Sequence, residues 1–127
     1  MKTIDVKLGD RSHVIHIESG LLKRLPELLS KYNQGQKWVI VSQKSLIEKY
    51  VSVFHSKLIE EGFDSHIIEI PEGEQAKSFR EYQKVVSQMI NLGCDRSTTI
   101  LVFGGGVPGD LGGFVAATFM RGVDYFQ

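Results

Sequence analysis

The stretch TTILVFGGGVPGDLGGFVAATFM (98–120) sets the architecture of the chain. Its first six residues carry no charge and are mostly branched or aromatic, which predicts a short strand buried on both faces, as in parallel sheets. A glycine loop (104–109) follows, and the apolar run 110–120 predicts a final helix. The stretch therefore predicts a strand, a glycine loop and a helix in immediate succession.

Gly104, Gly106 and Gly109 fit the pattern G-x-G-x-x-G between that strand and that helix. Glycines let the backbone turn tightly and approach a ligand, and a helix N-terminus offers unpaired N–H groups with about half a positive charge. The pattern favours an anion. In a common dinucleotide fold the loop follows the first strand, so its late position here argues against the ordinary arrangement. A purely structural tight turn is the alternative.

The rest of the chain predicts strands and helices that alternate. An alternating start around Gly9-Asp10 predicts a β-hairpin, and Ser78 with Glu81 is spaced as a capping box. After the hairpin, strand and helix alternate three times, which predicts an α/β fold: a Rossmann-like, mostly parallel sheet with helices on both faces. The expected elements are a Leu-rich segment (21–32) that Pro26 interrupts or starts, strands at 37–42, 66–70 and 98–103, and helices at 46–58, 79–90 and 110–120.

Composition excludes several classes of protein. The 127 residues include 15 Lys plus Arg and 15 Asp plus Glu, and this zero net charge argues against nonspecific binding to nucleic acids or anionic membranes. The single cysteine, Cys94, cannot form an internal disulfide. No apolar run approaches the roughly 20 residues that span a bilayer. We expect a single domain of a cytoplasmic protein.

The final helix is unusually apolar. Between Leu111 and Met120 there is no charge, and Thr118 is the only polar side chain. Gly112 and Gly113 each cost roughly 0.5–1 kcal/mol relative to Ala, which indicates close approach by another backbone or a ligand. A helix that is apolar all round needs cover all round, so we expect a second domain or a subunit on its outer side. The alternative is a helix wedged between strands and the preceding helices.

The segment GGGVPGDLGGFVAATFMRG (104–122) resembles the N-terminal NAD-binding domain of the 3-dehydroquinate synthases. PEGEQAKS (71–78) and Asp95-Arg96-Ser97 agree with the same family. The resemblance covers the whole chain but only about the first third of the enzyme. It implies that residues 1–127 are a fragment, the N-terminal NAD-binding α/β domain of a larger two-domain enzyme whose C-terminal helical, metal-binding domain is absent.

The resemblance implies an activity for the intact enzyme. Members of the family convert 3-deoxy-D-arabino-heptulosonate 7-phosphate to 3-dehydroquinate and phosphate in the shikimate pathway, using NAD for a transient oxidation and a divalent metal, zinc or cobalt. The implied partners are the sugar-phosphate substrate, the missing C-terminal domain and a second subunit in a homodimer. The metal ligands lie outside this chain, and we expect the fragment alone to be inactive.

The resemblance also assigns residues. Two sets match the cofactor-binding segments of the family: Glu72, Gly73, Glu74, Gln75, Ala76 and Lys77 at the adenosine side, and Gly105, Gly106, Val107, Pro108, Gly109 and Asp110 at the pyrophosphate and nicotinamide. Glu74 and Lys77 are the pair expected at the ribose, and Gly106 and Gly109 would offer backbone amides to the pyrophosphate. Asp110 is expected to hydrogen-bond the nicotinamide end or to complement the helix N-terminus. Arg121 matches an arginine that binds the substrate phosphate across the dimer interface. No residue matches a catalytic or metal-binding position. Without the resemblance, 71–77 would be a solvated loop and Arg121 a cation at a helix C-terminus.

The sequence departs from the family at two places. Ser42-Gln43-Lys44-Ser45 replaces a T-D-x-N-like stretch, which puts some adenosine contacts in doubt, and Pro108 removes one N–H from the loop although it suits a first helical turn. His13, His16, His55 and His66 are interpreted as ordinary surface or half-buried histidines. Rival hypotheses are another sugar-phosphate cyclase or a polyol dehydrogenase of the same superfamily, and a non-catalytic nucleotide-binding or assembly module.

Overall fold

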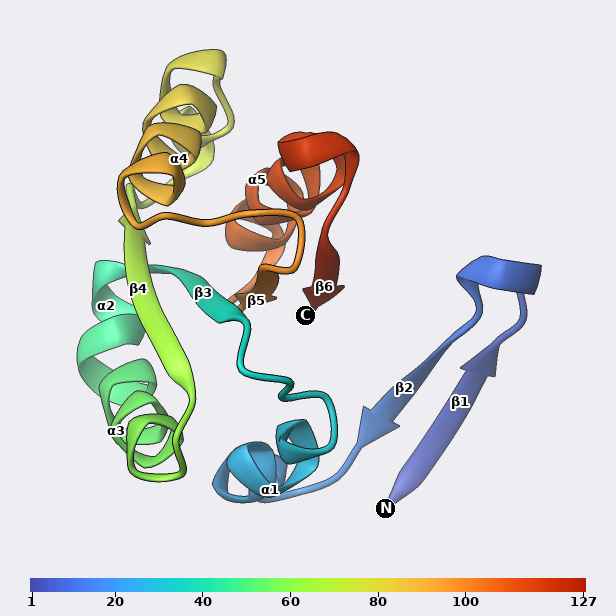
Figure 1. The fold of residues 1–127 in the computed structure, drawn as a ribbon. Coiled ribbons are helices and arrows are strands. Elements are labelled where there is room, and N and C mark those ends of the chain that lie inside the picture. The colour runs from blue at the N-terminus through green and yellow to red at the C-terminus, as the bar shows by residue number, and fades with distance from the viewer.

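Four parallel strands form the central sheet, in the order β4-β3-β5-β6 (Figure 1). The computed structural model describes residues 1–127. The strands are β3 (Lys37–Gln43), β4 (Asp64–Ile70), β5 (Thr99–Val102) and β6 (Asp124–Phe126). β3 pairs with β4 along its whole length and with β5 from Trp38 to Val41, so β3 and β5 occupy the middle of the sheet.

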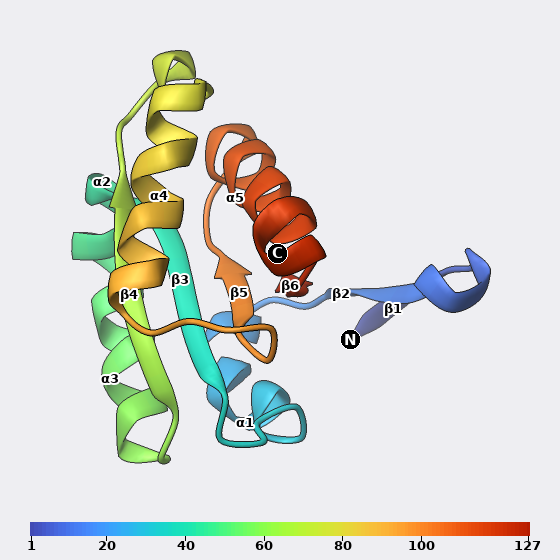
Figure 2. The same ribbon diagram turned by 45° about the horizontal axis from the view of Figure 1, so that its top comes forward.

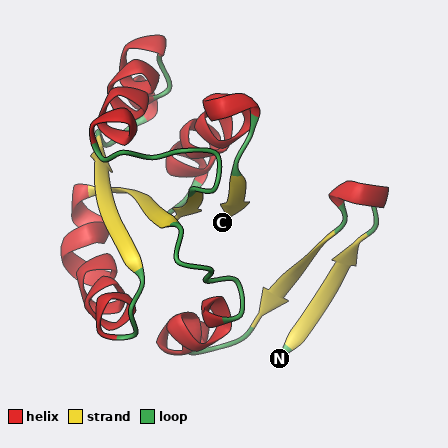
Figure 3. Cartoon of the chain, viewed as in Figure 1, coloured by secondary structure: helices red, strands yellow, loops and turns green.

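The chain begins with a hairpin that stands apart from this sheet (Figures 1 and 3). β1 (Lys2–Val6) and β2 (His13–Ile17) pair antiparallel, with Ile4 opposite Ile15. A short 3-10 turn, η1 (Gly9–Arg11), joins them, and Gly9 has φ +62°, a left-handed conformation that glycine adopts without strain. The hairpin expected from the alternating start is therefore confirmed.

The two faces of β3 belong to two separate hydrophobic clusters. Trp38 and Ile40 point to one face, Val39 and Val41 to the other, and all four are fully buried. This period of two is the geometry of an extended strand, and burial on both sides explains why the segment is continuously apolar. Helices therefore cover both faces of the sheet, as expected.

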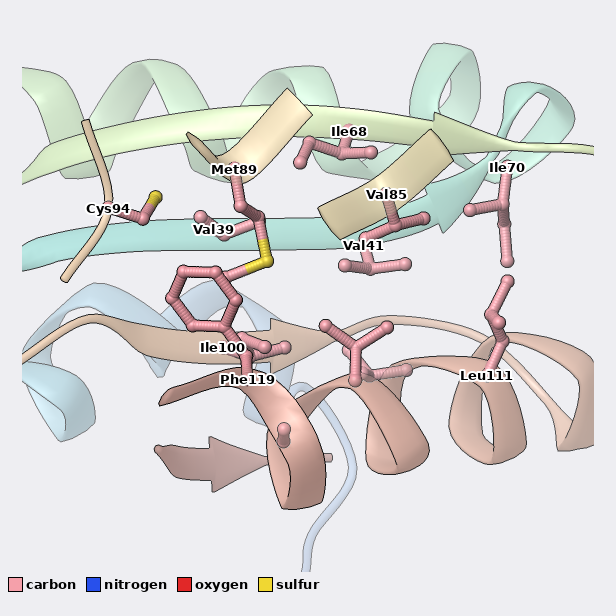
Figure 4. Close-up of a cluster of buried hydrophobic side chains, with 13 residues drawn as sticks. Val39, Val41, Ile68, Ile70, Val85, Met89, Cys94, Ile100, Leu111 and Phe119 are labelled. Carbon is pink, nitrogen blue, oxygen red and sulfur yellow. The ribbon is translucent and has the colours of Figure 1, made fainter. Parts of the chain in front are cut away.

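One face is covered by α4 (Phe79–Asn91) and α5 (Gly106–Thr118), which lie side by side in Figure 2. Ser78 caps α4, since its Oγ accepts from the N–H of Glu81 at 3.2 Å, which confirms that half of the expected capping box. Figure 4 shows the cluster beneath these helices. Its buried members are Val39, Val41, Ile68, Ile70, Val85, Met89, Cys94, Ile100, Val102, Leu111, Val115, Ala116 and Phe119.

The opposite face is covered by the earlier helices. A 3-10 turn, η2 (Leu21–Arg24), leads into α1 (Leu25–Ser30), with Pro26 in its first turn, so Pro26 starts this helix and does not interrupt it. A second helical run consists of α2 (Lys44–Leu46), a π-helical turn η3 (Ile47–Val51) and α3 (Ser52–Glu60). Their cluster comprises Leu29, Trp38, Ile40, Val51, Phe54, Leu58, Phe63 and Leu101.

At the end of the chain one prediction was wrong, and one strand was not predicted. α5 begins at Gly106, four residues before the expected start at Asp110, so most of the expected glycine loop is the first turn of a helix. Pro108 fits there because the N–H it lacks would have no helical partner. After the 3-10 turn η5 (Phe119–Arg121), the chain also forms β6, a strand of three residues that was not predicted because it is too short to show alternation.

Candidate functional site

The carboxyl ends of β3 and β5 lie side by side, and we refer to the region where the chain leaves them toward α2 and α5 as the crevice. These neighbouring parallel strands lead into helices on opposite faces, β3 into α2 and β5 into α5. Such a divergence is where open α/β sheets bind ligands. Two hydrogen bonds hold the strand exits together: Ser42 Oγ donates to the Phe103 carbonyl at 2.7 Å, and the Phe103 N–H donates to the Val41 carbonyl at 3.1 Å.

The three consecutive glycines before and at the start of α5 have two different roles. Gly104 has φ +142°, and a Cβ there would lie 2.7 Å from Pro108 Cγ and 3.1 Å from Leu46 Cδ1. At Gly105 and Gly106 a Cβ would meet nothing within 4 Å. Gly104 therefore makes the turn, while Gly105 and Gly106 leave the backbone open to a ligand.

The donors available at the start of α5 differ from those expected. Gly106 and Val107 occupy the first two helical positions, where an N–H has no partner within the helix. The N–H of Gly109 donates to the Gly105 carbonyl at 3.1 Å, so it is engaged inside the helix. Because the helix begins four residues early, the pair of free amides is Gly106 and Val107 in place of Gly106 and Gly109.

Lys77 connects the loop after β4 to the first turns of α5. Its Nζ lies 2.7 Å from Asp110 Oδ2 and 3.1 Å from Glu74 Oε2. These contacts raise the pKa of Lys77, the hydrogen bond to Asp110 contributing most and that to Glu74 next. The lysine therefore stays charged between two carboxylates. Neither contact was predicted. Glu74 and Lys77 were expected to hydrogen-bond a ribose, not each other, and nothing in the sequence links positions 77 and 110.

A second contact connects the exits of β3 and β4. Ser45, in the first turn of α2, donates to Glu72 Oε1 through its hydroxyl at 2.7 Å and through its backbone N–H at 3.2 Å. This is the stretch that departs from the T-D-x-N-like pattern. The departure therefore places a serine where it binds a carboxylate of the 71–77 loop, a contact that sequence reasoning missed.

The remaining candidate residues of the two segments shape the backbone. Gly73 has φ +85° and makes a sharp turn, and the buried Ala76 anchors the 3-10 turn η4 (Glu74–Ala76). Val107 packs against the cluster under α5, and Pro108 is buried. Gln75 donates to the carbonyl of Glu72. These side chains hold the two segments in place, so the polar groups that face the crevice come from their neighbours.

The structure does not bring Arg121 to this crevice. It lies beyond the opposite end of α5, and a helix of 13 residues is about 20 Å long. Met120 and Arg121 have φ of +49° and +67°, so both adopt left-handed backbone conformations that are unusual for residues other than glycine. A guanidinium at this end can serve only another site or another subunit.

The outer side of α5 is exposed, as expected for a surface that needs cover. Phe114 is 47% exposed, and Met120, in the turn η5 that follows the helix, is 46% exposed, so the alternative of a fully wedged helix is wrong. Gly112 allows close packing on the sheet, since a Cβ there would collide with Val102. Between α4 and α5 lies an open hollow of about 280 Å³, lined by Lys77, Ser78, Phe79, Tyr82, Asp110, Leu111 and Phe114.

No group of three or more His, Cys, Asp or Glu side chains in the structure could hold a metal ion. His13 and His16 lie on opposite faces of β2, His55 Nε2 lies 2.9 Å from the Ser65 carbonyl, and His66 Nε2 lies 2.7 Å from Asp64 Oδ1. Separately, none of the helices has the length and the apolar character needed to cross a membrane.

Comparison with known proteins gives the following relatives. Residues 67–127 match the model of a family described as 3-dehydroquinate synthase N-terminal. The 3-dehydroquinate synthases of Syntrophotalea carbinolica and Clostridium beijerinckii are 40% and 37% identical to the chain over all 127 residues. The chain spans only 35% and 36% of the length of these two relatives.

Solved structures agree on the fold. A crystal structure of 2-deoxy-scyllo-inosose synthase complexed with carbaglucose-6-phosphate, NAD+ and Co2+ has a TM-score of 0.82 at 21% identity, covering 98% of this chain and 33% of that one. ValA, the 2-epi-5-epi-valiolone synthase of Streptomyces hygroscopicus with NAD+ and Zn2+ bound, has a TM-score of 0.71 at 26% identity, covering 85% and 29%. These structures confirm the α/β fold, and the sequence relatives confirm the resemblance inferred from the motifs.

Proposed function

Because the chain is similar over its whole length to 3-dehydroquinate synthases, we propose that it is the NAD-binding α/β domain of such an enzyme. The observation that carries the proposal is the open start of α5 in the crevice between β3 and β5. There the amides of Gly106 and Val107 are free, and space is open above Gly105 and Gly106. An anion fits this place because backbone N–H groups and the helix dipole both favour negative charge.

The surrounding residues suit the rest of a dinucleotide. Glu74 can accept hydrogen bonds from ribose hydroxyls and Lys77 can donate to them, and their ion pair, with the contact from Lys77 to Asp110, holds both beside the first turns of α5. Asp110 contacts Lys77 and so lies at the ribose side of the site in this arrangement. We therefore assign Asp110 to orienting Lys77, in place of a contact at the nicotinamide end. NAD, when bound, supplies the hydride chemistry, while the protein positions it.

For the intact protein we propose conversion of 3-deoxy-D-arabino-heptulosonate 7-phosphate to 3-dehydroquinate and phosphate. The chain spans about a third of its relatives, which supports residues 1–127 as an N-terminal domain whose metal ligands, for zinc or cobalt, come from elsewhere. In a cytoplasmic homodimer Arg121 would contact the substrate phosphate of the other subunit. A guanidinium suits this role because it donates two parallel hydrogen bonds to a phosphate.

A second candidate is a related sugar-phosphate cyclase that forms a different ring. It is favoured by the TM-score of 0.82 to 2-deoxy-scyllo-inosose synthase, whose fold this chain shares. We prefer the first candidate because the identity to 3-dehydroquinate synthases is 37–40%, against 21% to that enzyme. Offering the intact protein both heptulosonate phosphate and glucose 6-phosphate distinguishes the two.

Calorimetric titration of the 127-residue chain with NAD tests the proposal. We expect binding of one NAD per chain, competed by ADP-ribose, and no turnover of the heptulosonate phosphate when NAD and Zn2+ or Co2+ are added. Absence of NAD binding would contradict the assignment of the crevice. Turnover by the chain alone would contradict the proposal that other segments supply the metal site.

A further inference from the structure

Ser45 and Glu72 make the only hydrogen-bonded link between the α2 start and the carboxylates of the 71–77 loop. Both donors of Ser45, hydroxyl and backbone N–H, go to the same oxygen, Glu72 Oε1, at 2.7 and 3.2 Å. A carboxylate at this place also complements the partial positive charge of the helix that starts at Lys44. Local charge and two directed hydrogen bonds therefore favour one position of Glu72.

This position matters because the 71–77 loop has few other anchors. At its far end Ala76 is buried and Lys77 is paired with Asp110. At its near end the loop continues from Ile70, which is buried and pairs with Gln43 in the sheet, and the Glu72 carbonyl accepts a hydrogen bond from Gln75 within the loop. The contact from Gln43 Nε2 to the Pro71 carbonyl, at 3.5 Å, is long for a hydrogen bond. Ser45 is therefore the residue outside the loop whose hydrogen bonds reach the side chain of Glu72.

We propose that Ser45 is a positioning residue for cofactor binding, which holds Glu72 and thereby the loop that presents Glu74 and Lys77. The inference rests on the proposed function, since the loop is assigned to the adenosine side of NAD. Ser45 acts without donating to the cofactor, because both of its donors, the hydroxyl and the backbone N–H, are used by Glu72. The departure from the T-D-x-N-like stretch thus replaces direct contact with indirect support.

Variants of Ser45 test the role by two independent measurements. Ser45→Ala removes one of the two donors, and we expect the Kd for NAD to rise about fivefold, as for an exposed hydrogen bond to a charged group. Ser45→Thr keeps the hydroxyl and should restore the affinity to within about twofold. Amide hydrogen exchange of residues 72–77 should become faster in Ser45→Ala in the absence of any ligand, and return in Ser45→Thr.

Two controls separate positioning from general damage. Ser56→Ala removes a hydroxyl that bonds the Ser52 carbonyl on the same helical run, remote from the crevice, and should change neither measurement. Inorganic pyrophosphate, which needs the α5 start alone, should bind Ser45→Ala as it binds the unsubstituted chain. In the Ser45→Ala/Glu72→Ala double variant the loss should be no larger than in Glu72→Ala alone, because both changes break one contact.

Failure of the proposed role of Ser45 can be distinguished from failure of the proposed function. If the unsubstituted chain fails to bind NAD, the proposed function fails, and the exchange measurement still decides whether Ser45 orders the loop. If Ser45→Ala leaves both the exchange of 72–77 and the NAD affinity unchanged, the role of Ser45 is overturned. Additive losses in the double variant, or no restoration by threonine, would overturn it as well.

Discussion

Two helices start at the same crevice, and they differ in what meets their first amides. At α2 the chain supplies its own anion, since Glu72 accepts the N–H of Ser45. At α5 no carboxylate meets the amides of Gly106 and Val107, because Asp110 is held by Lys77. The same helix-end physics thus gives a satisfied terminus in one place and an open one in the other. A helix start becomes a candidate anion site only where the protein leaves it unfilled.

A side chain at Gly104 should disrupt the turn that leads into the open start of α5. Gly104→Ala forces a side chain into a left-handed backbone conformation and against Pro108 and Leu46, so we expect unfolding free energy to fall by about 3 kcal/mol. Gly105→Ala is the matched control, because its φ is −88° and nothing lies within 4 Å of the added Cβ. It should cost less than about 1 kcal/mol. Urea denaturation measures both, and equal losses would contradict the assigned roles.

Much of this region could be predicted from its sequence. The run 98–103 and the glycines at 104–109 indicate a strand, a turn and a helix start, because propensity and pattern act locally. The contacts Ser45–Glu72 and Lys77–Asp110 could not be predicted, since they join residues 27 and 33 positions apart that meet only after the sheet forms. The exact start of α5 could not be predicted either, because glycine and proline in the first turn of a helix have the sequence pattern of a loop.

A carboxylate introduced at the start of α5, like the one that meets the start of α2, tests whether the open amides bind the diphosphate. Gly106→Asp places a carboxylate at the first position of α5, where a Cβ has room and a negative charge suits the helix. We expect stability to be preserved and the Kd for NAD to rise about thirtyfold, or about 2 kcal/mol, through repulsion of the diphosphate. Gly106→Asn has the same size without the charge.

In Gly106→Asn we expect a loss of affinity no greater than about threefold, measured by the same calorimetric titration. If the two variants lose affinity equally, size and not charge is responsible, and the account of the open start is wrong.

Removing the cation between the two carboxylates should have a smaller effect on binding. Lys77→Met leaves Glu74 and Asp110 without their shared partner beside the first turns of α5, so we expect the Kd for NAD to rise about tenfold. Lys77→Arg retains the charge and should stay within about threefold of the unsubstituted chain. Fluorescence titration with NADH at two salt concentrations provides the measurement, and an unchanged affinity in Lys77→Met would contradict the assignment.

The smallest effect on stability is expected from a change at the amino ends of β3 and β4, away from the crevice. Lys37 Nζ lies 3.0 Å from Asp64 Oδ2, and the hydrogen bonds from Lys37 and then His66 hold the pKa of Asp64 below its usual 3.8. A lowered carboxyl pKa stabilises the fold above pH 3.8, and that stabilisation is lost as the pH falls through the lowered value.

Asp64→Asn should therefore lower the unfolding free energy by about 0.5 kcal/mol at pH 7 and leave it unchanged at the acidic end of the titration. Its NAD affinity should equal that of the unsubstituted chain. Denaturation curves at several pH values test the first statement. A loss of NAD binding in Asp64→Asn would show that the charges at the amino ends of the strands also affect the site at their carboxyl ends.

The assignment of the open helix start is tested most directly by following backbone amide resonances of the chain during titration with NAD. We expect the signals of Gly105, Gly106 and Val107 to move most and saturate together, while the Ser45 amide, already bonded to Glu72, moves little. If the Ser45 amide responds and the three signals at the start of α5 stay in place at saturating NAD, the dinucleotide binds elsewhere and the account is contradicted.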